Sequence, residues 1–248
     1  MTPMTATRHV CPHCGVPRKT ATICPECATR LVAEEKAKQV ERERQKRTAR
    51  ARRAVSASSM GKLLEDASFD KWEHRPELAK LFTDCRAYAQ EWPKRKAQGK
   101  GLVLAGLNGT GKSYLAACIK REVEAQGDVV VFVSVPDLGG RIRATWDREK
   151  GAPTEQEVFD AMTDADLLVL DDFGAEAPRP ITEEQLYRII DGRYRNKRPV
   201  VVTANVSPKD FEARFGIRIA DRFAETCDVL IANAKSYRRI LAERGAKE

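Results

Sequence analysis

The sequence predicts an α/β fold in which a five-stranded parallel sheet is flanked by helices. Five short apolar runs carry this prediction, at residues 101–106, 129–135, 166–171, 199–205 and 228–233. Helical patterns separate them, and apolar strands that alternate with helices are typical of a parallel sheet covered on both faces. The 248 residues are enough for one large domain or two modest ones.

Positive charge is concentrated near the N-terminus. The formal net charge is +8, and the whole excess lies in the first 60 residues, because basic and acidic side chains balance in the remainder. A basic arm on a neutral body is typical of contact with nucleic acid or an acidic protein surface. The start, MTPMTATRHV, has no apolar signal segment, and the apolar runs are too short to span a bilayer. We therefore expect a soluble, cytoplasmic protein with no membrane contact.

Four cysteines form two C-x2-C pairs near the N-terminus: Cys11, Cys14, Cys24 and Cys27. Thiols in a reducing compartment are not expected to form disulfides. Two such pairs bring four thiolates to the corners of a tetrahedron, the geometry of structural zinc sites. Chance spacing or a redox pair is the alternative, but redox pairs seldom occur doubled. We predict a structural zinc-binding module over residues 1–30.

Residues 29–55 predict a helix, because they lack Gly and Pro and are rich in helix-forming residues. The second half of this segment is strongly basic. Two interpretations stay open, a helix that contacts DNA or a partner and a solvated spacer. Small residues at 56–61 indicate a linker, so residues 31–61 are predicted as basic helix and linker and residues 62–248 as the α/β domain. Another helix is expected over residues 76–92.

The segment GLNGTGKS follows the first predicted strand and precedes a predicted helix over residues 113–126. This is the G-x4-G-K-S pattern of a phosphate-binding loop in the context that the pattern requires. Its glycines let backbone amides point at phosphates, and the helix N-terminus adds partial positive charge. Lys112 is expected to reach the β- and γ-phosphates, and Ser113 to bind Mg²⁺. The predicted ATP-binding residues are Gly106, Leu107, Asn108, Gly109, Thr110, Gly111, Lys112 and Ser113.

Asp171 and Asp172 end the third predicted strand. A carboxylate at the C-terminal end of a buried strand, near a phosphate-binding loop, is suited to Mg²⁺. We assign this role to Asp171, together with Ser113, and expect Asp172 to orient or deprotonate the attacking water. Asn205 closes the fourth predicted strand. It is expected between the γ-phosphate and the water if that strand lies between the other two.

Together these residues resemble the AAA+ ATPases, and within them the helicase loaders of the DnaC and DnaI type. The resemblance covers about residues 62–248. GLNGTGKS resembles Walker A, LLVLDDFG resembles Walker B and TAN resembles sensor 1. RIADR at 218–222 resembles the arginine-finger box, and SYR at 236–238 resembles sensor 2. Many ATPases share Walker A and B, whereas RIADR followed by a strand and then SYR is more specific.

The resemblance implies roles for three arginines. Arg222 would be the finger that faces ATP bound by a neighbouring subunit, Arg218 would support it, and Arg238 would contact the nucleotide of its own subunit. Ordinary i,i+3 ion pairs on one helix, Arg218 with Asp221 and Arg222 with Glu225, are the alternative.

The resemblance also implies a single-stranded DNA contact near residues 139–158. Arg141, Arg143, Arg148 and Lys150 would follow phosphates, and Trp146 would stack on a base. A surface helix with Trp146 buried is the alternative.

The sequence therefore predicts an AAA+ ATPase with ATP, Mg²⁺ and Zn²⁺ as cofactors. Its function would be that of a loader that binds single-stranded DNA, self-associates through its ATP sites and delivers the hexameric replicative helicase to DNA. Many related ATPases carry Glu at the position of Asp172, so hydrolysis is expected to be slow or dependent on assembly. An IstB-type transposition helper that binds duplex DNA, or a zinc-containing ATP-binding adaptor with little hydrolysis, is the alternative. The cysteine pairs favour the loader.

Overall fold

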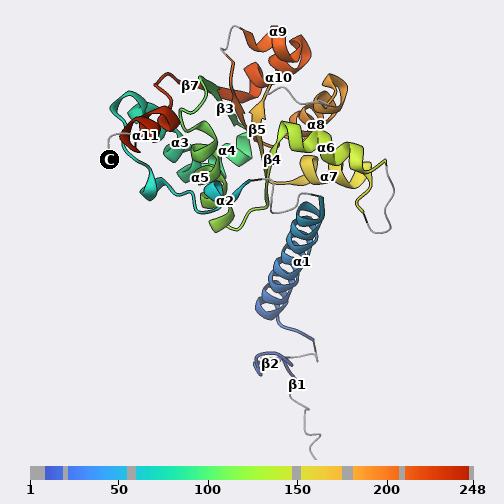
Figure 1. The fold of residues 1–248 in the computed structure, drawn as a ribbon. Helices are drawn as coiled ribbons and strands as arrows, with labels where there is room; N and C mark the ends of the chain where they lie inside the picture. Colours follow the sequence, from blue (N-terminus) through green and yellow to red (C-terminus); the bar gives the residue numbers. More distant parts are fainter. Residues whose placement is uncertain are drawn as a thin grey trace, which may run out of the picture. The chain divides into compact units, whose positions relative to one another are not determined.

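A computed structural model describes residues 9–18, 22–54, 60–146, 152–174, 181–206 and 210–245. The chain divides into two compact units, Met1–Lys46 and Arg47–Glu248. None of the described helices is both long and apolar enough to cross a membrane. Figure 1 labels the elements. The strands are β1 (His9–Val10), β2 (Pro17–Arg18), β3 (Gly101–Gly106), β4 (Val130–Ser134), β5 (Leu167–Phe173), β6 (Val200–Ala204) and β7 (Cys227–Ala232). The helices are α1 (Pro25–Ala54), α2 (Lys62–Glu65), α3 (Ala79–Gln90), α4 (Trp92–Gln98), α5 (Lys112–Ala125), α6 (Val135–Ala144), α7 (Glu155–Asp164), α8 (Glu183–Arg195), α9 (Phe211–Phe215), α10 (Ile217–Thr226) and α11 (Tyr237–Gly245), with 3-10 turns η2 (Phe69–Lys71) and η3 (Pro76–Leu78).

The N-terminal unit contains an antiparallel hairpin and most of α1. β1 and β2 pair across a turn in which Gly15 donates its N–H to the Cys11 carbonyl at 2.9 Å. Gly15 has a φ of 71°, a conformation that favours glycine. α1 begins at Pro25, earlier than the predicted residue 29, because proline is well suited to the first helical turn. Cys27 therefore lies in the first turn of α1.

The second unit is built on a parallel sheet with the strand order β4-β5-β6-β3-β7. β6 pairs with β3 on one side and with β5 on the other. It therefore lies between the strand that precedes the phosphate-binding loop and the strand that ends in the two aspartates. All three strands run in the same direction, so their C-terminal ends meet at one edge of the sheet. The predicted fold class, with its five parallel strands, is confirmed.

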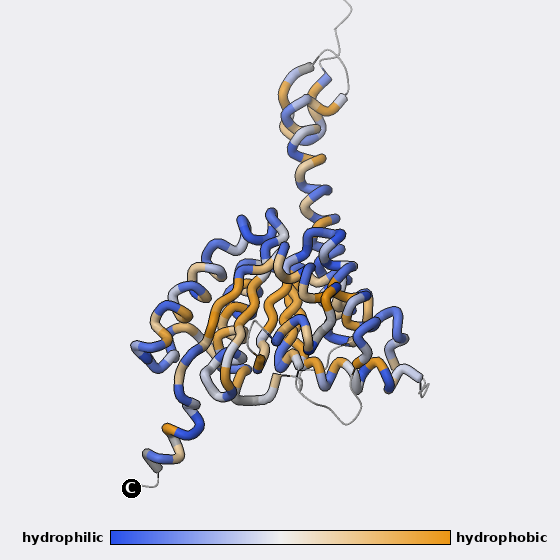
Figure 2. The backbone as a smooth tube through the Cα atoms, turned by 90° about the horizontal axis from the view of Figure 1, so that it is seen from above, coloured by the Kyte–Doolittle hydropathy of each residue, from blue (hydrophilic) through white to orange (hydrophobic). Residues whose placement is uncertain are grey.

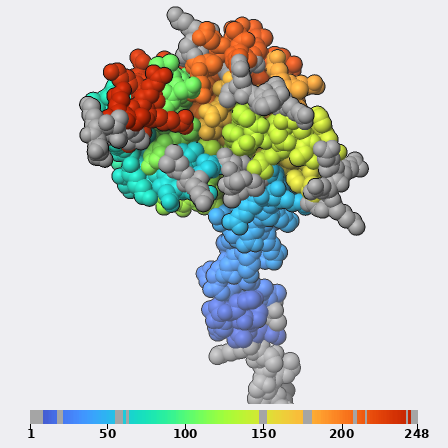
Figure 3. All heavy atoms as spheres, in the orientation of Figure 1, coloured from blue at the N-terminus to red at the C-terminus, as the bar shows by residue number. Residues whose placement is uncertain are grey.

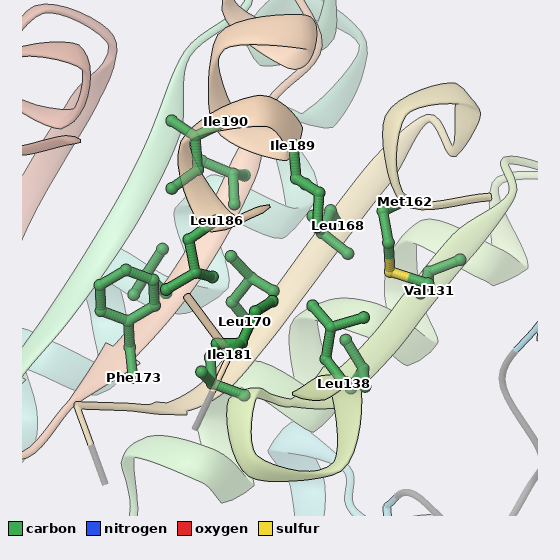
Figure 4. Packing of buried hydrophobic residues seen from close by; sticks show 14 of the residues in the cluster. Val131, Leu138, Met162, Leu168, Leu170, Phe173, Ile181, Leu186, Ile189 and Ile190 are labelled. Carbon is green, nitrogen blue, oxygen red and sulfur yellow. The ribbon is translucent and has the colours of Figure 1, made fainter. Parts of the chain in front are cut away.

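Alternate strand residues face two separate hydrophobic cores. On one face, Leu168 and Leu170 of β5 pack with Ile189 of α8, as Figure 4 shows. On the other face, Leu167 and Val169 of β5 pack in a cluster that includes residues of α3 and α5. The strands accordingly form the hydrophobic centre of this unit in Figure 2. Burial on both faces explains why β3, β4, β5 and β6 are continuous apolar runs in the sequence. The edge strand β7 differs, because its Val229 and Ile231 are 48% and 59% exposed.

The segment predicted as one helix over residues 76–92 is divided. η3 comes first, α3 ends at Gln90, and α4 begins at Trp92. Pro93 lies in the first turn of α4. Proline has no backbone N–H for an intrahelical bond, and its ring clashes with the preceding turn of a helix. The prediction of a single continuous helix was therefore wrong.

The C-terminal turns of α1 belong to the second unit and pack within it. Arg47 Nη1 lies 2.8 Å from Asp166 Oδ1, and Arg50 Nη1 lies 2.6 Å from Asp164 Oδ2. Ala54, at the end of α1, is 2% exposed and joins the core beneath α6 and α7. The packing of Ala54 and the ion pairs of Arg47 and Arg50 show that these turns are not a solvated spacer. Contact of this helix with DNA or a partner stays a prediction.

Arg193 of α8 is a buried arginine that joins three elements. It is 1% exposed, and its guanidinium donates to the backbone carbonyls of Met162, Ala165 and Pro199 at 2.7, 3.0 and 2.5 Å. These carbonyls lie near the end of α7 and at the starts of β5 and β6. Burial lowers the pKa of Arg193 to about 9, so its stabilising effect depends on these hydrogen bonds.

Replacing this side chain, Arg193→Met, is expected to lower the free energy of unfolding by about 3 kcal/mol, because several buried carbonyls lose their donor. Urea denaturation followed by circular dichroism measures the change. Arg86→Met, on the exposed side of α3, is the control and is expected to change stability by less than about 0.5 kcal/mol. Equal stability of the two variants would contradict the structural role of Arg193.

Candidate functional site

The predicted phosphate-binding residues, 106–113, run from the last residue of β3 through the connecting loop into the first turn of α5. Gly109 and Gly111 have φ values of 76° and 100°, which glycine adopts without strain. A Cβ on Gly109 would lie 2.2 Å from the Ser236 hydroxyl oxygen, and one on Gly111 would lie 2.6 Å from the Trp72 ring. The two glycines therefore allow both the curl of the loop and its close packing.

Lys112 is buried inside this loop. Its Nζ donates to the carbonyls of Gly106 and Leu107 at 3.0 and 2.7 Å. Burial lowers the pKa of Lys112 to about 8, and the nearby Asp172 and Asp171 carboxylates oppose this shift. The ammonium group is thus held by two neutral carbonyls, which it can exchange for the oxygens of a phosphate chain.

Asp171 lies at the C-terminal end of β5 and is 6% exposed. Thr203 of β6 donates its hydroxyl to Asp171 Oδ1 at 2.5 Å. Burial raises the pKa of Asp171, while hydrogen bonds from Thr203 and Ser113 work in the opposite direction. The carboxylate and the Ser113 hydroxyl are therefore neighbours, and this oxygen pair fits a magnesium ion at the mouth of the loop.

Asp172 follows at an irregularity of β5. The register between β5 and β6 shifts between Leu170 and Phe173, and Asp172 has a φ of 53°. Its N–H donates to the Thr203 hydroxyl at 3.0 Å, and Asn205 Nδ2 donates to its carboxylate at 3.3 Å. Bulges of this kind redirect side chains at functional sites. Asp172 and Asn205 therefore lie together at the edge of the sheet where β3 leads into the phosphate-binding loop.

The SYR segment before and within α11 packs directly on the loop. Tyr237 donates its N–H to the Gly109 carbonyl at 2.7 Å, and its hydroxyl donates to Glu73. The buried Arg75 donates from Nη2 to the Lys235 carbonyl at 2.7 Å. Arg238 follows in the first turn of α11 and is exposed. The segment assigned to sensor 2 is therefore held to the phosphate-binding loop by a backbone hydrogen bond, and side-chain hydrogen bonds join it to Glu73 and Arg75.

The two arginines of RIADR lie on α10 and contact α8. The Arg218 guanidinium lies 3.7 Å from the centroid of the Tyr187 ring. Arg222 Nη2 lies 3.2 Å from Asp191 Oδ1. Glu225 instead accepts hydrogen bonds from Tyr194, at 2.9 and 3.0 Å. Arg222 therefore pairs with a different carboxylate from the one that the i,i+3 alternative names.

The model of the IstB-like ATP-binding protein family matches residues 24–244. The chain belongs to this family. Among curated relatives, "Replicative helicase loader DnaC" of Escherichia coli strain K12 is 27% identical over 198 residues, which span 79% of each chain. "Uncharacterized protein YdaV" of the same strain is 26% identical over 180 residues, spanning 72% of this chain and 70% of that one.

Solved structures show that this IstB-like protein has the fold of AAA+ ATPases. A crystal structure of the DnaC helicase loader superposes with a TM-score of 0.59 at 23% identity, over 69% of this chain and 99% of that one. The AMPPCP-bound DnaA of Aquifex aeolicus gives a TM-score of 0.56 at 16% identity, over 73% of this chain and 55% of that one. The resemblance predicted from the motifs is confirmed.

The four N-terminal cysteines of this IstB-like protein form one cluster. Their sulfur atoms lie within 4.8 Å of one another, and tetrahedral zinc with bonds of about 2.3 Å places sulfurs about 3.8 Å apart. Cys24 and Cys27 donate their N–H groups to the sulfurs of Cys11 and Cys24, both at 3.4 Å. Backbone hydrogen bonds from Cys24 and His13 lower the pKa of Cys11 to about 6, while the neighbouring thiols raise the pKa of Cys27 to about 12. Four thiolates need a cation between them, so the donor set fits zinc.

The predicted DNA-contacting segment is described in part. Arg141 and Arg143 lie on α6, and Trp146 follows that helix with 63% of its surface exposed. The alternative of a buried Trp146 is therefore wrong. Arg148 and Lys150 lie outside the described residues.

Sequence reasoning placed Thr203 in the sensor 1 segment TAN without a role of its own, and it assigned no function to Trp72 or Asp191. Thr203 links Asp171 to the backbone of Asp172, and a hydroxyl in the apolar strand VVVTA was a visible signal. Trp72 packs on Gly111, and Asp191 binds Arg222, through contacts far apart in the sequence. No local pattern marks either of these residues.

Proposed function

We propose that this IstB-like protein is an ATP-dependent loader of a replicative DNA helicase. The observation that carries this proposal is a combination of two features in one unit. The phosphate-binding loop, Asp172 and Asn205 meet at one edge of the sheet, and an arginine box contacts α8. The similarity to proteins named replicative helicase loader, over 79% of the chain, supports the same function. We place its action in the cytoplasm, where thiols stay reduced and able to bind zinc.

In this proposal Lys112 leaves its two loop carbonyls and binds the β- and γ-phosphates of ATP. Ser113 and Asp171 would hold Mg²⁺, which would supply positive charge to the phosphate oxygens. Asp172 accepts a proton from the water as its oxygen bonds to the γ-phosphorus, and the bond from that phosphorus to the bridging oxygen breaks, so that ADP leaves. Asn205 orients the water and the γ-phosphate. Arg238 contacts the nucleotide of its own subunit. Arg222, supported by Arg218, reaches the nucleotide of a second copy, so hydrolysis is slow until subunits assemble.

The N-terminal cysteine cluster binds Zn²⁺ and presents the surface that docks on the hexameric helicase. Capture of replicative helicases by the immobilised full-length protein tests this step, with Cys24→Ser as the variant that loses the module. Lys112→Ala then tests whether release of the captured helicase onto circular single-stranded DNA depends on ATP. Absence of capture by the wild-type protein would overturn the loader function.

Single-stranded DNA binds along α6 in this proposal, with Trp146 stacking on a base. Trp146→Ala is expected to weaken binding of an oligothymidylate about 5- to 100-fold, because one base-stacking contact is lost. Fluorescence anisotropy of the labelled oligonucleotide measures the affinity. Trp146→Phe keeps an aromatic face and is expected to bind within about threefold of wild type. Unchanged affinity of the alanine variant would remove Trp146 from the DNA site.

The family match also supports a second function, that of a transposition helper ATPase that binds duplex DNA. The same anisotropy assay separates the two. ATP-dependent filaments on duplex DNA, with no preference for single strands, would favour the transposition helper.

A further inference from the structure

One face of α8 is built around a buried carboxylate. Tyr187, Asp191 and Tyr194 are spaced i, i+4 and i+7 on this helix, so they lie on the same side. The Asp191 side chain is 9% exposed. It accepts hydrogen bonds from the Tyr187 hydroxyl at 3.2 Å and from Arg222 Nη2 at 3.2 Å, both at Oδ1. Arg195 Nε binds the other oxygen at 2.7 Å.

Both arginines of the box on α10, Arg218 and Arg222, contact this face of α8. The Arg222 guanidinium lies 4.0 Å from the centroid of the Tyr194 ring while it binds Asp191. The Arg218 guanidinium lies over Tyr187, the tyrosine whose hydroxyl binds the same carboxylate. Asp191 therefore fixes Arg222 directly and Arg218 through Tyr187.

The start of α10 is fitted to α8 as well. Gly216 precedes α10 with a φ of 81°, and a Cβ at this position would lie 2.2 Å from Glu183 Oε1. The two helices pack against each other, and they lie side by side at the surface in Figures 1 and 3. A groove of about 890 Å³ opens beside them, with Asp191, Arg195 and Arg218 among its lining residues. Arg218 lines this groove, so a phosphate group from another molecule can approach Arg218 through it. Arg222 lines a second cavity, of about 350 Å³, together with Tyr194 and Arg195.

We propose that this face of α8 positions the arginine box for the ATP of a second copy of the chain, with Asp191 as the central positioning residue. The inference rests on the proposed function, because it requires that the arginines act between subunits. Loss of the Asp191 charge leaves the guanidinium groups of Arg195 and Arg222 without their shared counter-ion. Arg218 and Arg222 then repel one another and lose their common orientation, while the phosphate-binding loop of the same subunit is unaffected.

A mixing experiment with two full-length variants tests the proposal. The acceptor carries Arg218→Ala and Arg222→Ala and keeps an intact ATP site. The donor carries Lys112→Ala, so that it contributes its arginine box but hydrolyses no ATP itself. ATP hydrolysis in the mixture, measured with single-stranded DNA present, then reports arginines supplied in trans.

Adding Asp191→Asn to the donor is expected to lower the restored kcat at least tenfold. The same substitution in the acceptor, whose arginines are already absent, is expected to change kcat by less than twofold. Glu184→Gln in the donor removes a charge from the same helix and groove and is expected to restore hydrolysis fully. A general folding defect would appear in donor and acceptor alike, so the difference between them isolates positioning.

Two results would overturn the inference. Restoration by the Asp191→Asn donor at the level of the unmodified donor would show that the carboxylate does not position the box. An equal loss in donor and acceptor would show a role in folding instead. If the unmodified donor restores no hydrolysis, the arginines do not act between subunits. That result would also refute this part of the proposed function.

Discussion

Lys112→Ala is expected to lower kcat for ATP hydrolysis about 10²- to 10³-fold, because one charged donor to the transferring phosphate is lost.

The wild-type protein is also expected to bind ATP about tenfold more weakly at pH 9 than at pH 7. Burial holds the pKa of Lys112 at about 8 in the nucleotide-free protein. Phosphate oxygens favour the protonated ammonium, so ATP affinity is full below this pKa and falls as the pH rises through it.

Isothermal titration of ATP with Mg²⁺, in buffers of different ionisation enthalpy, measures both the affinity and the proton uptake at pH 9. Lys112→Ala is expected to remove the pH step and the proton uptake together. Lys120→Ala, on the same helix and ion-paired with Glu124, is the control and is expected to keep both. A pH step that persists in Lys112→Ala would assign the titration to another group and contradict the prediction.

The parts of this protein that could be predicted from sequence are those coded locally. β3, β4, β5 and β6 are apolar runs because they are buried on both faces of the sheet. The phosphate-binding loop is a continuous segment between one strand and one helix. Asp171 and Asn205 could be placed near the loop because parallel strands end at the same edge. Each of these predictions depended on a local feature of the sequence: a hydrophobic periodicity, a motif or the end of a strand.

The remaining features depend on contacts between distant segments. The bulge that turns Asp172 toward Asn205 arises from the pairing of β5 with β6, and no residue of β5 predicts this bulge. Within this chain the partner of Arg222 is Asp191, which lies on another helix, whereas the intrachain partner considered from sequence was its helical neighbour Glu225. Tertiary packing decides which partner a charged side chain binds, and the spacing of residues along one helix does not reveal that partner.

Cys24→Ser is expected to unfold the N-terminal hairpin without affecting ATP binding. The buried hydrophobic cluster in the described part of this unit consists of Cys11, Cys24 and Cys27. Its larger apolar side chains are exposed, as in Val10 and Val16 at 50% and 51%. With so little apolar burial, the hairpin depends on the metal, and structural zinc supplies about 10–16 kcal/mol of binding free energy in small modules.

Hydrogen exchange of the amides around Cys11 and Cys24, together with zinc content, measures this effect. Exchange is expected to become rapid in Cys24→Ser, and equally in wild-type protein treated with a chelator, while the dissociation constant for ATP stays within about twofold, since the ATP site has its own two-sided core. Cys118→Ala, a buried cysteine of α5 outside the cluster, is expected to retain zinc. Protection that survives metal removal would show that hairpin pairing alone folds the module. Loss of helicase capture with ATP binding intact would assign the docking surface to the zinc module and not to the ATPase fold.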